Sequence, residues 1–227
     1  MCDPARSDGK FFDINRIEAD MKLCKEPNRV IGNCKYWSIY LPHHRYGLGA
    51  DTSEGVGKDS SALGVFNFKT GELVATYNSN QIKPELFAYE IARVGTEYGK
   101  CVVAPEMNNM SGGIVITTLK GIYNNILRHT DRTKVTETES PKLGWHTNSR
   151  SKPQMFMDFR RDYNDGIIKI YDIEVLKEMK SYATNDLVEK TGIVTKHFDL
   201  LTAVVIAWQM KDVLEDKNVA SVQYHEY

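Results

Sequence analysis

The sequence predicts an α/β fold with a mixed β-sheet, in which three antiparallel strands are followed by parallel strands and helices flank the sheet. Three observations predict it. Two apolar runs of strand length meet at the tight turn Lys69-Thr70-Gly71, a helical spacing of apolar residues begins after Pro84, and residues 101–104 form a short apolar run without alternation. Such a run is typical of a central strand that is buried on both faces.

The first half of the chain is predicted to contain three strands, then a helix and a fourth strand. The first three strands span residues 46–52, 62–68 and 72–77, and their short connections favour antiparallel pairing. The helix starts at Pro84, because proline is tolerated in the first turn of a helix. The strand at 101–104 follows it.

The second half is predicted to alternate helices with one more strand. Helices are expected at 112–124, 151–163 and 173–181, a strand at 167–170, and a closing apolar helix at 200–210. Residues 128–147 are polar and are interpreted as a loop or a protruding hairpin insertion, and Lys190-Thr191-Gly192 predicts a second hairpin. This order of strands and helices is that of the ribonuclease H-like folds.

The composition is that of an ordinary globular protein. Of 227 residues, 41% are hydrophobic and 26% are charged, with a formal net charge of -1, which argues against a disordered or membrane protein. The N-terminal sequence lacks the apolar stretch of a secretory signal, so a cytoplasmic location is expected. The four cysteines have neither zinc nor disulfide spacing and are expected to be reduced thiols.

One domain is predicted, with an attachment at each end. Residues 36–215 form the predicted domain, 1–35 a linker or N-terminal extension, and 216–227 a C-terminal tail.

Three acidic residues lie at the ends of apolar runs: Asp51, Glu106 and Asp199. Because such runs form buried strands and helices, acids at their ends can converge in space although they are far apart in the sequence. Carboxylate oxygens bind Mg²⁺ or Mn²⁺, and two such ions can hold the attacking and leaving oxygens of a phosphodiester. The pattern therefore predicts metal-dependent phosphodiester cleavage, whereas each acid alone would be interpreted as a helix cap or a solvated strand end.

Five short motifs occur in one order along residues 35–210. They are Gly-Ala-Asp-Thr-Ser-Glu-Gly, Pro-Glu-Met-Asn-Asn, Lys-Leu-Gly-Trp-His-Thr-Asn, Ser-Lys-Pro-Gln-Met and His-Phe-Asp-Leu-Leu-Thr-Ala. In this combination the chain resembles the nuclease domain of the large terminase subunit of tailed bacteriophages. The resemblance implies a ribonuclease H-like endonuclease that cuts concatemeric double-stranded viral DNA during genome packaging in the host cytoplasm. It also implies two Mg²⁺ or Mn²⁺ ions and, in the full assembly, a portal, a small terminase subunit and an ATPase domain.

The resemblance implies that three acids are catalytic and bind metal: Asp51, Glu106 and Asp199. Many relatives carry two adjacent aspartates at the last motif, whereas this chain has Phe198 before Asp199. Asp59 is therefore a candidate for an additional metal ligand, although its sequence context is also typical of a turn. His197 is interpreted as a hydrogen-bonded structural residue and Glu54 as a loop acid.

Basic residues are concentrated between residues 128 and 161, where acidic residues are interleaved with them. A solvated mixed surface is therefore an alternative to a DNA-binding surface. The predicted DNA-binding residues are Arg150, Lys152, Arg128 and Lys142. Arg150 and Lys152 flank a predicted helix start, where backbone amides favour phosphate. Trp145 is interpreted as a core residue.

Several other functions remain open. Gly55-Val56-Gly57-Lys58 is not a phosphate-binding loop, because Thr52 stands where glycine is needed and Asp59 follows the lysine, so the chain contains no ATPase motif. An actin-like or sugar-kinase-type fold is disfavoured, because about 175 core residues are too few for its duplicated domain. A Holliday junction resolvase-like nuclease and a non-catalytic docking module of a packaging motor remain as alternatives.

Overall fold

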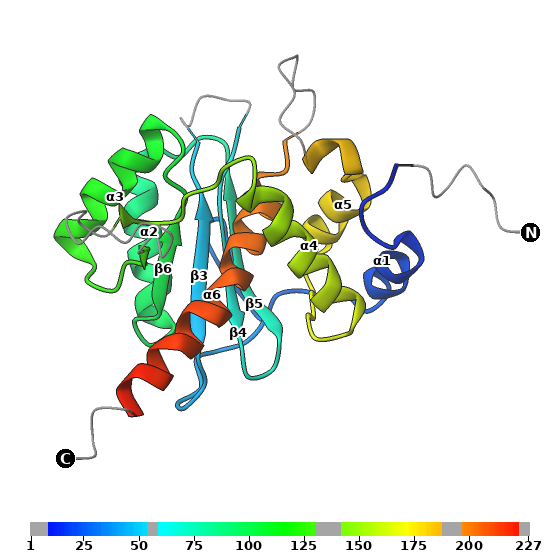
Figure 1. Cartoon of the computed structure of the whole chain (residues 1–227), viewed down its shortest axis with the longest axis horizontal. Coiled ribbons are helices and arrows are strands. Elements are labelled where there is room, and N and C mark those ends of the chain that lie inside the picture. The colour runs from blue at the N-terminus through cyan, green and yellow to red at the C-terminus, as the bar shows by residue number, and fades with distance from the viewer. Residues whose placement is uncertain (1–8, 54–58, 130–141, 188–196, 223–227) are drawn as a thin grey trace, which may run out of the picture.

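The computed structural model describes residues 9–53, 59–129, 142–187 and 197–222. A six-stranded sheet forms the centre of the molecule, and helices lie on both of its faces (Figure 1). The predicted α/β fold with a mixed sheet is therefore confirmed. No helix in these described stretches is long and apolar enough to cross a membrane.

The central sheet has the strand order β1-β2-β5-β4-β3-β6. Its strands are β1 (Arg29–Ile31), β2 (Cys34–Tyr36), β3 (Tyr46–Asp51), β4 (Ser61–Asn67), β5 (Glu72–Ser79) and β6 (Val102–Pro105). All neighbours are antiparallel except β3 and β6, which are parallel. Thus β3, β4 and β5 are the three predicted antiparallel strands. The predicted run at 101–104 forms β6, which is buried along its length as expected but is the last strand in this order and not a central one.

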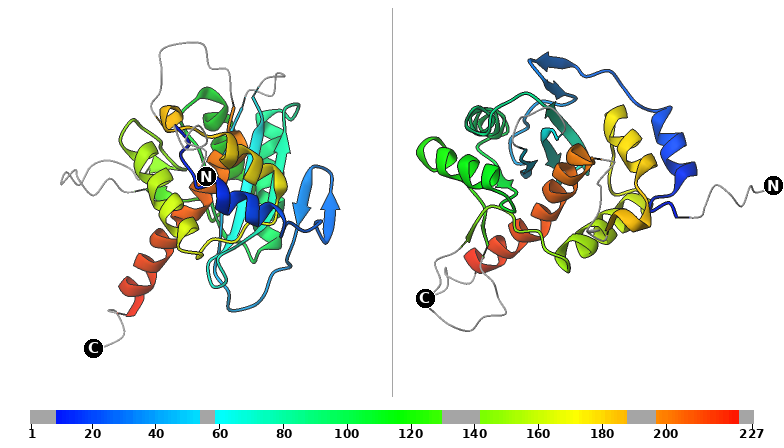
Figure 2. Two further views of the ribbon diagram at one scale, coloured as in Figure 1. Left: turned by 90° about the vertical axis from the view of Figure 1, so that its right-hand side faces the viewer. Right: turned by 90° about the horizontal axis from the view of Figure 1, so that it is seen from above.

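Each face of the sheet packs against its own layer of helices (Figure 2). One face is covered by α2 (Pro84–Glu97) and α3 (Met110–Ile122). The other is covered by α1 (Ile14–Met21), α4 (Ser151–Asn164), α5 (Ile173–Ser181) and α6 (Asp199–Val222). Side chains alternate along β4, so that Ala62 packs in the second layer and Leu63 in the first. This alternation produces two hydrophobic cores, one on each face.

Two glycines of the sheet determine how closely α6 approaches it. A Cβ atom at Gly49 in β3 would lie 2.2 Å from the Ala207 nitrogen and 2.4 Å from the Ala203 oxygen. A Cβ atom at Gly64 in β4 would lie 2.9 Å from a methyl group of Val204. The backbone of α6 therefore rests directly on β3, where no side chain larger than hydrogen fits.

The connection after α4 differs from the sequence prediction. Residues 167–170 were expected to form a strand, but only Lys169 pairs with the sheet, through a single parallel bridge to Glu72. The amide nitrogens of Ile167 and Ile168 both donate to the Asp162 carbonyl at the end of α4, at 3.0 and 3.4 Å. Because these groups close the helix, they are not available to form a ladder, and the predicted strand is wrong.

The N-terminal segment belongs to the core of the molecule. Phe11, Phe12 and Ile17 are buried, and the Phe11 amide donates to the Tyr182 carbonyl at 3.1 Å. The predicted boundary between 35 and 36 falls inside β2, and the predicted boundary at 216 falls inside α6.

Two short elements complete the second half. The strands β7 (Arg128–His129) and β8 (Lys142–Leu143) pair antiparallel, which places a hairpin stem at the ends of the predicted insertion. A 3-10 helix spans Thr184–Leu187. The second predicted hairpin, at 190–192, lies outside the described residues.

Candidate active site

Asp51 and Glu106 are brought together by the parallel pair β3 and β6. Asp51 is the last residue of β3, and Glu106 follows the last residue of β6. The Glu106 amide donates to the Ala50 carbonyl at 2.8 Å, so the two strands remain in register up to the acids. The carboxyl ends of parallel strands meet at one edge of a sheet, which is why residues so distant in sequence become neighbours.

Asp199 reaches the same edge from α6, as its first residue. Its Oδ2 atom accepts a hydrogen bond from the Ser60 amide at 2.6 Å. Ser60 immediately precedes β4, in which Ala62 is the cross-strand partner of Asp51. The contact of α6 with Gly49 and the bond from Ser60 therefore hold Asp199 beside the first two acids.

Burial and the repulsion between the acids raise the pKa values of Asp51 and Asp199. Burial raises the pKa of Asp51 well above its ordinary value, and the charges of Glu106 and Asp199 and a hydrogen bond with Glu106 raise it further. The pKa of Asp199 is also raised, first by burial and then by the charges of Asp59 and Glu106, against the Ser60 amide and His197, which lower it. The edge thus concentrates negative charge that nearby protein groups do not fully neutralise.

A divalent cation fits this donor set. Three carboxylates that carry hard oxygen atoms face one another, and a bound cation would remove the repulsion that raises the Asp51 pKa. In the described part of the chain, no group of three or more His, Cys, Asp and Glu side chains is already arranged as a metal site.

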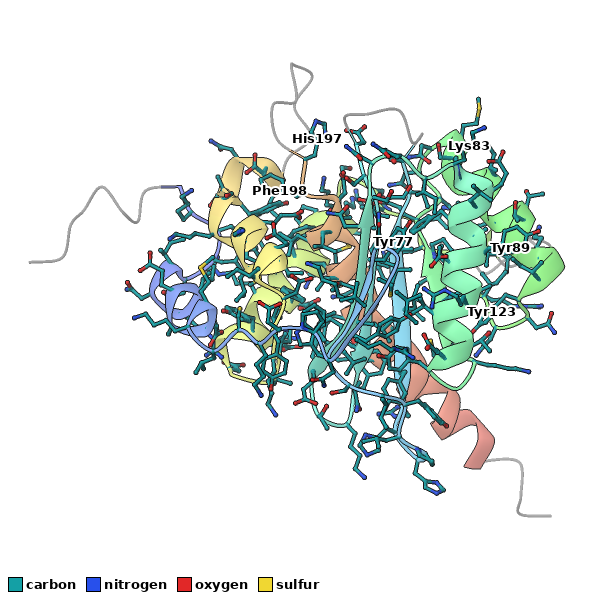
Figure 3. The ribbon with its side chains drawn as sticks, turned by 180° about the vertical axis from the view of Figure 1, so that it is seen from behind. Tyr77, Lys83, Tyr89, Tyr123, His197 and Phe198 are labelled. Atoms are coloured by element: carbon teal, nitrogen blue, oxygen red, sulfur yellow. The ribbon has the colours of Figure 1, made fainter. Side chains whose placement is uncertain are left out.

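Asp59 and His197 form a pair beside the acids. The Nδ1 atom of His197 lies 2.6 Å from Oδ1 of Asp59, and both side chains are partly exposed. Figure 3 shows His197 at the end of the sheet where α6 begins. The interpretation of His197 as a hydrogen-bonded residue agrees with this contact, whereas the role of Asp59 as a metal ligand stays a prediction.

Phe198 occupies the position next to Asp199 where the two-aspartate pattern has a second acid. Its ring packs edge-on against Tyr182, with centroids 4.8 Å apart, and it joins the core beneath α5 (Figure 3). An aspartate in this position would lose that packing and place a charge against an apolar layer. The departure from the two-aspartate pattern is therefore part of how this core is packed.

The comparisons with known proteins agree with this geometry. No protein-family model matches the sequence, and no curated protein matches it. Among solved structures, the cobalt-bound large terminase nuclease of thermophilic phage G20c matches with a TM-score of 0.64 and 17% identity, over 89% of this chain and 98% of that chain. Its magnesium-bound form matches with a TM-score of 0.63 and 17% identity, over 89% of this chain and 98% of that chain. The large terminase nuclease domain of Thermus phage P74-26 matches with a TM-score of 0.58 and 17% identity, over 85% of this chain and 93% of that chain.

The chain has the large terminase nuclease fold. This result confirms the fold that the five motifs implied. At 17% identity the likeness establishes the architecture, and the assignment of individual residues continues to rest on the geometry of this chain.

In this terminase nuclease fold, the segment before α4 passes alongside the acids. The Trp145 amide donates to the Pro105 carbonyl at 2.8 Å, and the Trp145 carbonyl accepts from the Met107 amide at 2.9 Å. Trp145 itself packs partly buried against the core, as predicted. Asn148 then caps α4, since its Oδ1 atom accepts from the amides of Arg150 and Ser151, both at 2.9 Å.

The predicted DNA-binding residues are not all in the same position relative to the acids. Lys152 is partly buried in the first turn of α4, and its charge acts to lower the pKa of Asp51. Arg150 is exposed just before that helix, and Arg128 is exposed in β7. Lys142 lies in β8, and its side chain is outside the described part of the structure. Lys152 thus acts on an acid of the candidate site in the described structure.

Two residues of the site were missed in the sequence. Asn108 was assigned no role in the site from the sequence, but its Nδ2 atom donates to Oε1 of Glu106 at 2.9 Å. Glu178 in α5 accepts a hydrogen bond from the Leu201 amide at 2.8 Å, which caps the helix that carries Asp199. Burial raises the Glu178 pKa to about 7. The adjacent pair Asn108-Asn109 was a usable signal, because only one of the two side chains can cap α3 and the other is left for another role. Nothing in the sequence connects Glu178 with α6.

Proposed function

We propose that this chain is a divalent-metal-dependent endonuclease that cuts concatemeric double-stranded viral DNA during genome packaging. The observation that carries the proposal is the convergence of Asp51, Glu106 and Asp199 at one edge of the sheet, where the charges of Glu106 and Asp199 add to burial in raising the pKa of Asp51. Related folds that were solved with magnesium or cobalt bound support it.

In this proposal the three carboxylates hold the ions, with Asp59 as a candidate additional ligand. Two bound Mg²⁺ or Mn²⁺ ions would supply an activated water and stabilise the charge on the attacking and leaving oxygens. The Ser60 amide fixes one oxygen of Asp199 and leaves the other available as a ligand. The parallel strands fix the backbones of Asp51 and Glu106, so that both carboxylates are positioned before the substrate arrives.

The basic residues around α4 are proposed to hold the DNA backbone. Lys152 lies close enough to Asp51 to act on its charge, which suits a phosphate placed between them. Arg150, Arg128 and Lys142 would extend this contact along the duplex without reading the bases. In the full assembly, the proposed partners are a portal, a small terminase subunit and an ATPase domain, which act together in the host cytoplasm.

The test is cleavage of supercoiled plasmid and linear duplex by the purified chain. Cutting should require Mg²⁺ or Mn²⁺ and stop in excess chelator, while Ca²⁺ should support binding with little cutting. Asp51→Asn should abolish cutting. Asp158→Asn is the matched control, because Asp158 is an acid of α4 that pairs with Arg161, away from the three carboxylates. Undiminished cutting by Asp51→Asn would remove that residue from the site.

The same assay separates the alternatives. A Holliday junction resolvase-like enzyme would cut four-way junctions in preference to linear duplex, whereas a packaging nuclease should cut linear duplex at least as well. A docking module would cut neither substrate under any metal condition.

A further inference from the structure

Asn108 makes two side-chain hydrogen bonds that connect separate parts of the candidate site. Its Nδ2 atom donates to Oε1 of Glu106 at 2.9 Å, and its Oδ1 atom accepts from the Thr147 amide at 3.1 Å. Asn108 is exposed, and exposed hydrogen bonds of this kind add little to the stability of a fold. Folding alone therefore does not explain why this amide is held at both of its ends.

The first bond restricts the Glu106 side chain. Glu106 has several rotatable bonds and is only partly buried, so its carboxylate would otherwise sample many positions. A donor on one oxygen fixes the carboxylate and leaves the second oxygen available to a cation. Such outer contacts orient the residues that bind metal ions and affect how tightly the ions bind.

The second bond connects Glu106 to the start of α4. Thr147 lies between Trp145, which is bonded on both sides to the strand end at Glu106, and Asn148, which caps α4. The same helix carries Lys152 in its first turn. Asn108 thus connects Glu106 to the segment that leads into the helix carrying Lys152.

The neighbouring Asn109 has a different task. Its Oδ1 atom accepts from the Gly112 amide at 2.8 Å and so caps α3, while its Nδ2 atom donates to the Thr52 carbonyl at 2.9 Å. Asn109 therefore connects the backbone at the start of α3 to the backbone at Thr52, as a residue needed for folding does. Of the two adjacent amides, only Asn108 contacts a carboxylate of the site.

We propose that Asn108 is a positioning residue, which holds the Glu106 carboxylate in place for a divalent cation and couples it to the segment before α4. This inference rests on the proposed function. It adds a residue whose loss should weaken cation binding without weakening the metal-free fold.

The experiment is a calorimetric titration of Mn²⁺ into the metal-free chain, without DNA. Asn108→Leu keeps the size of the side chain but removes the donor and the acceptor, and Asn108→Ala is a second variant in case leucine disturbs the surface. The matched control is Asn125→Leu, because Asn125 is an exposed amide that donates to the Lys100 carbonyl at 2.9 Å, at the opposite end of β6. Melting curves in chelator monitor the fold of each protein.

Both Asn108 variants should bind Mn²⁺ about tenfold more weakly than the parent, a loss typical of contacts behind a metal ligand. Their melting temperatures in chelator should equal that of the parent, and Asn125→Leu should bind like the parent. Equal Mn²⁺ affinity in parent and Asn108 variants would overturn the inference and leave the proposed function standing, as would an equal loss in Asn125→Leu. A parent that binds no Mn²⁺ would overturn the proposed function and this inference together.

Discussion

Helix α6 contributes to the environment of two aspartates, and the two environments are opposite. At its N-terminal end, α6 adds the acid Asp199 to two other acids, and the pKa of Asp51 is raised. Further along, Trp208 and Lys211 donate to Asp162, which is almost fully buried. Burial opposes ionisation of Asp162, but these donors and Arg161 outweigh it and the pKa is lowered.

The difference distinguishes a carboxylate that stabilises the fold from one that is proposed to bind a ligand. Asp162 has all of its charge compensated within the protein, so removing it leaves partners unsatisfied. Asp51 lies beside two further acids whose charges oppose its ionisation, so the protein should gain stability when its charge is removed. The comparison predicts opposite effects of the same substitution at the two positions.

The largest expected effect is on cutting. Asp51→Ala, Glu106→Ala and Asp199→Ala should each lower the cleavage rate by more than about 100-fold, because each removes a proposed ligand of the ions. Losses in double variants should not add, since the acids act as one unit. Asp162→Asn, measured at a temperature where it is folded, should cut like the parent. A rate within a few-fold of the parent for any of the three alanine variants would exclude that acid.

The next effect is on stability at the compensated site. Asp162→Ala should lower the free energy of unfolding by about 3 kcal/mol, because it leaves the Trp208 indole and the Lys211 ammonium without their acceptor. The loss lies at the lower end for a buried pair, since Lys211 retains some access to solvent. Denaturant unfolding measures it. A loss no larger than that of the partly buried control Asp158→Asn would contradict the comparison.

Asp51→Asn should have the opposite sign and a smaller size. Neutralising this side chain relieves its repulsion with Glu106 and Asp199, so the melting temperature in chelator near neutral pH should rise. Mg²⁺ or Mn²⁺ should then stabilise the parent more than the variant, because ligands that bind the folded state raise its stability by mass action. If the variant melts below the parent in chelator and both gain equally from metal, Asp51 is a structural residue.

The stability of the metal-free protein should depend on pH in opposite ways at the carboxyl groups with raised pKa values and at Asp162, whose pKa is lowered. Asp51, Asp199 and Glu178 have raised pKa values in the folded state, so the stability they contribute is present at low pH and is lost as pH rises. For Glu178 the loss should occur between its ordinary pKa of 4.5 and about 7. Asp162 has a lowered pKa, so its contribution is lost only as pH falls below the ordinary range. Melting temperatures in chelator should therefore decline above pH 4.5, and Glu178→Gln should flatten that decline.

The smallest effect concerns DNA affinity. Arg150→Ala and Lys152→Ala should each reduce the slope of log affinity against log salt by about one, because each removes one phosphate contact. Binding is measured in Ca²⁺ to prevent cutting. Arg160→Ala is the matched control, since the Arg160 guanidinium lies over the Phe11 ring, 5.1 Å from its centroid. An unchanged slope in the Arg150 and Lys152 variants would place the DNA on another surface.

Much of the fold could be predicted because the signals were local. The apolar runs of β3 to β6, the Pro84 helix start and the Asp172 cap of α5 each depend on a few adjacent residues. The prediction failed where distant contacts decide. Phe11, Phe12 and Ile17 lie in a polar segment whose burial depends on α4 and α5, and residues 167–170 have strand composition but serve the end of α4.

In the candidate site, too, residues with a local sequence signal could be predicted and residues that act through distant contacts could not. Asp51, Glu106 and Asp199 could be found because each ends an apolar element, and the structure brings them to one edge. Their assignment as metal ligands stays a prediction. Asn108 and Glu178 act through single hydrogen bonds to side chains or amides, and no periodicity in the sequence reports such bonds.

The contact of α6 with Gly49 means that part of the site's geometry is determined inside the core. Asp199 can approach Asp51 only as far as the helix approaches the strand, and that approach depends on a missing side chain two residues before Asp51. A methyl group there would act as a wedge and tilt the helix, moving one acid relative to the other while all three acids remain. Evolution or an engineer can thus adjust the spacing of the acids, and with it the size of cation that the proposed site would accept, from a buried position outside the proposed contacts with DNA and metal.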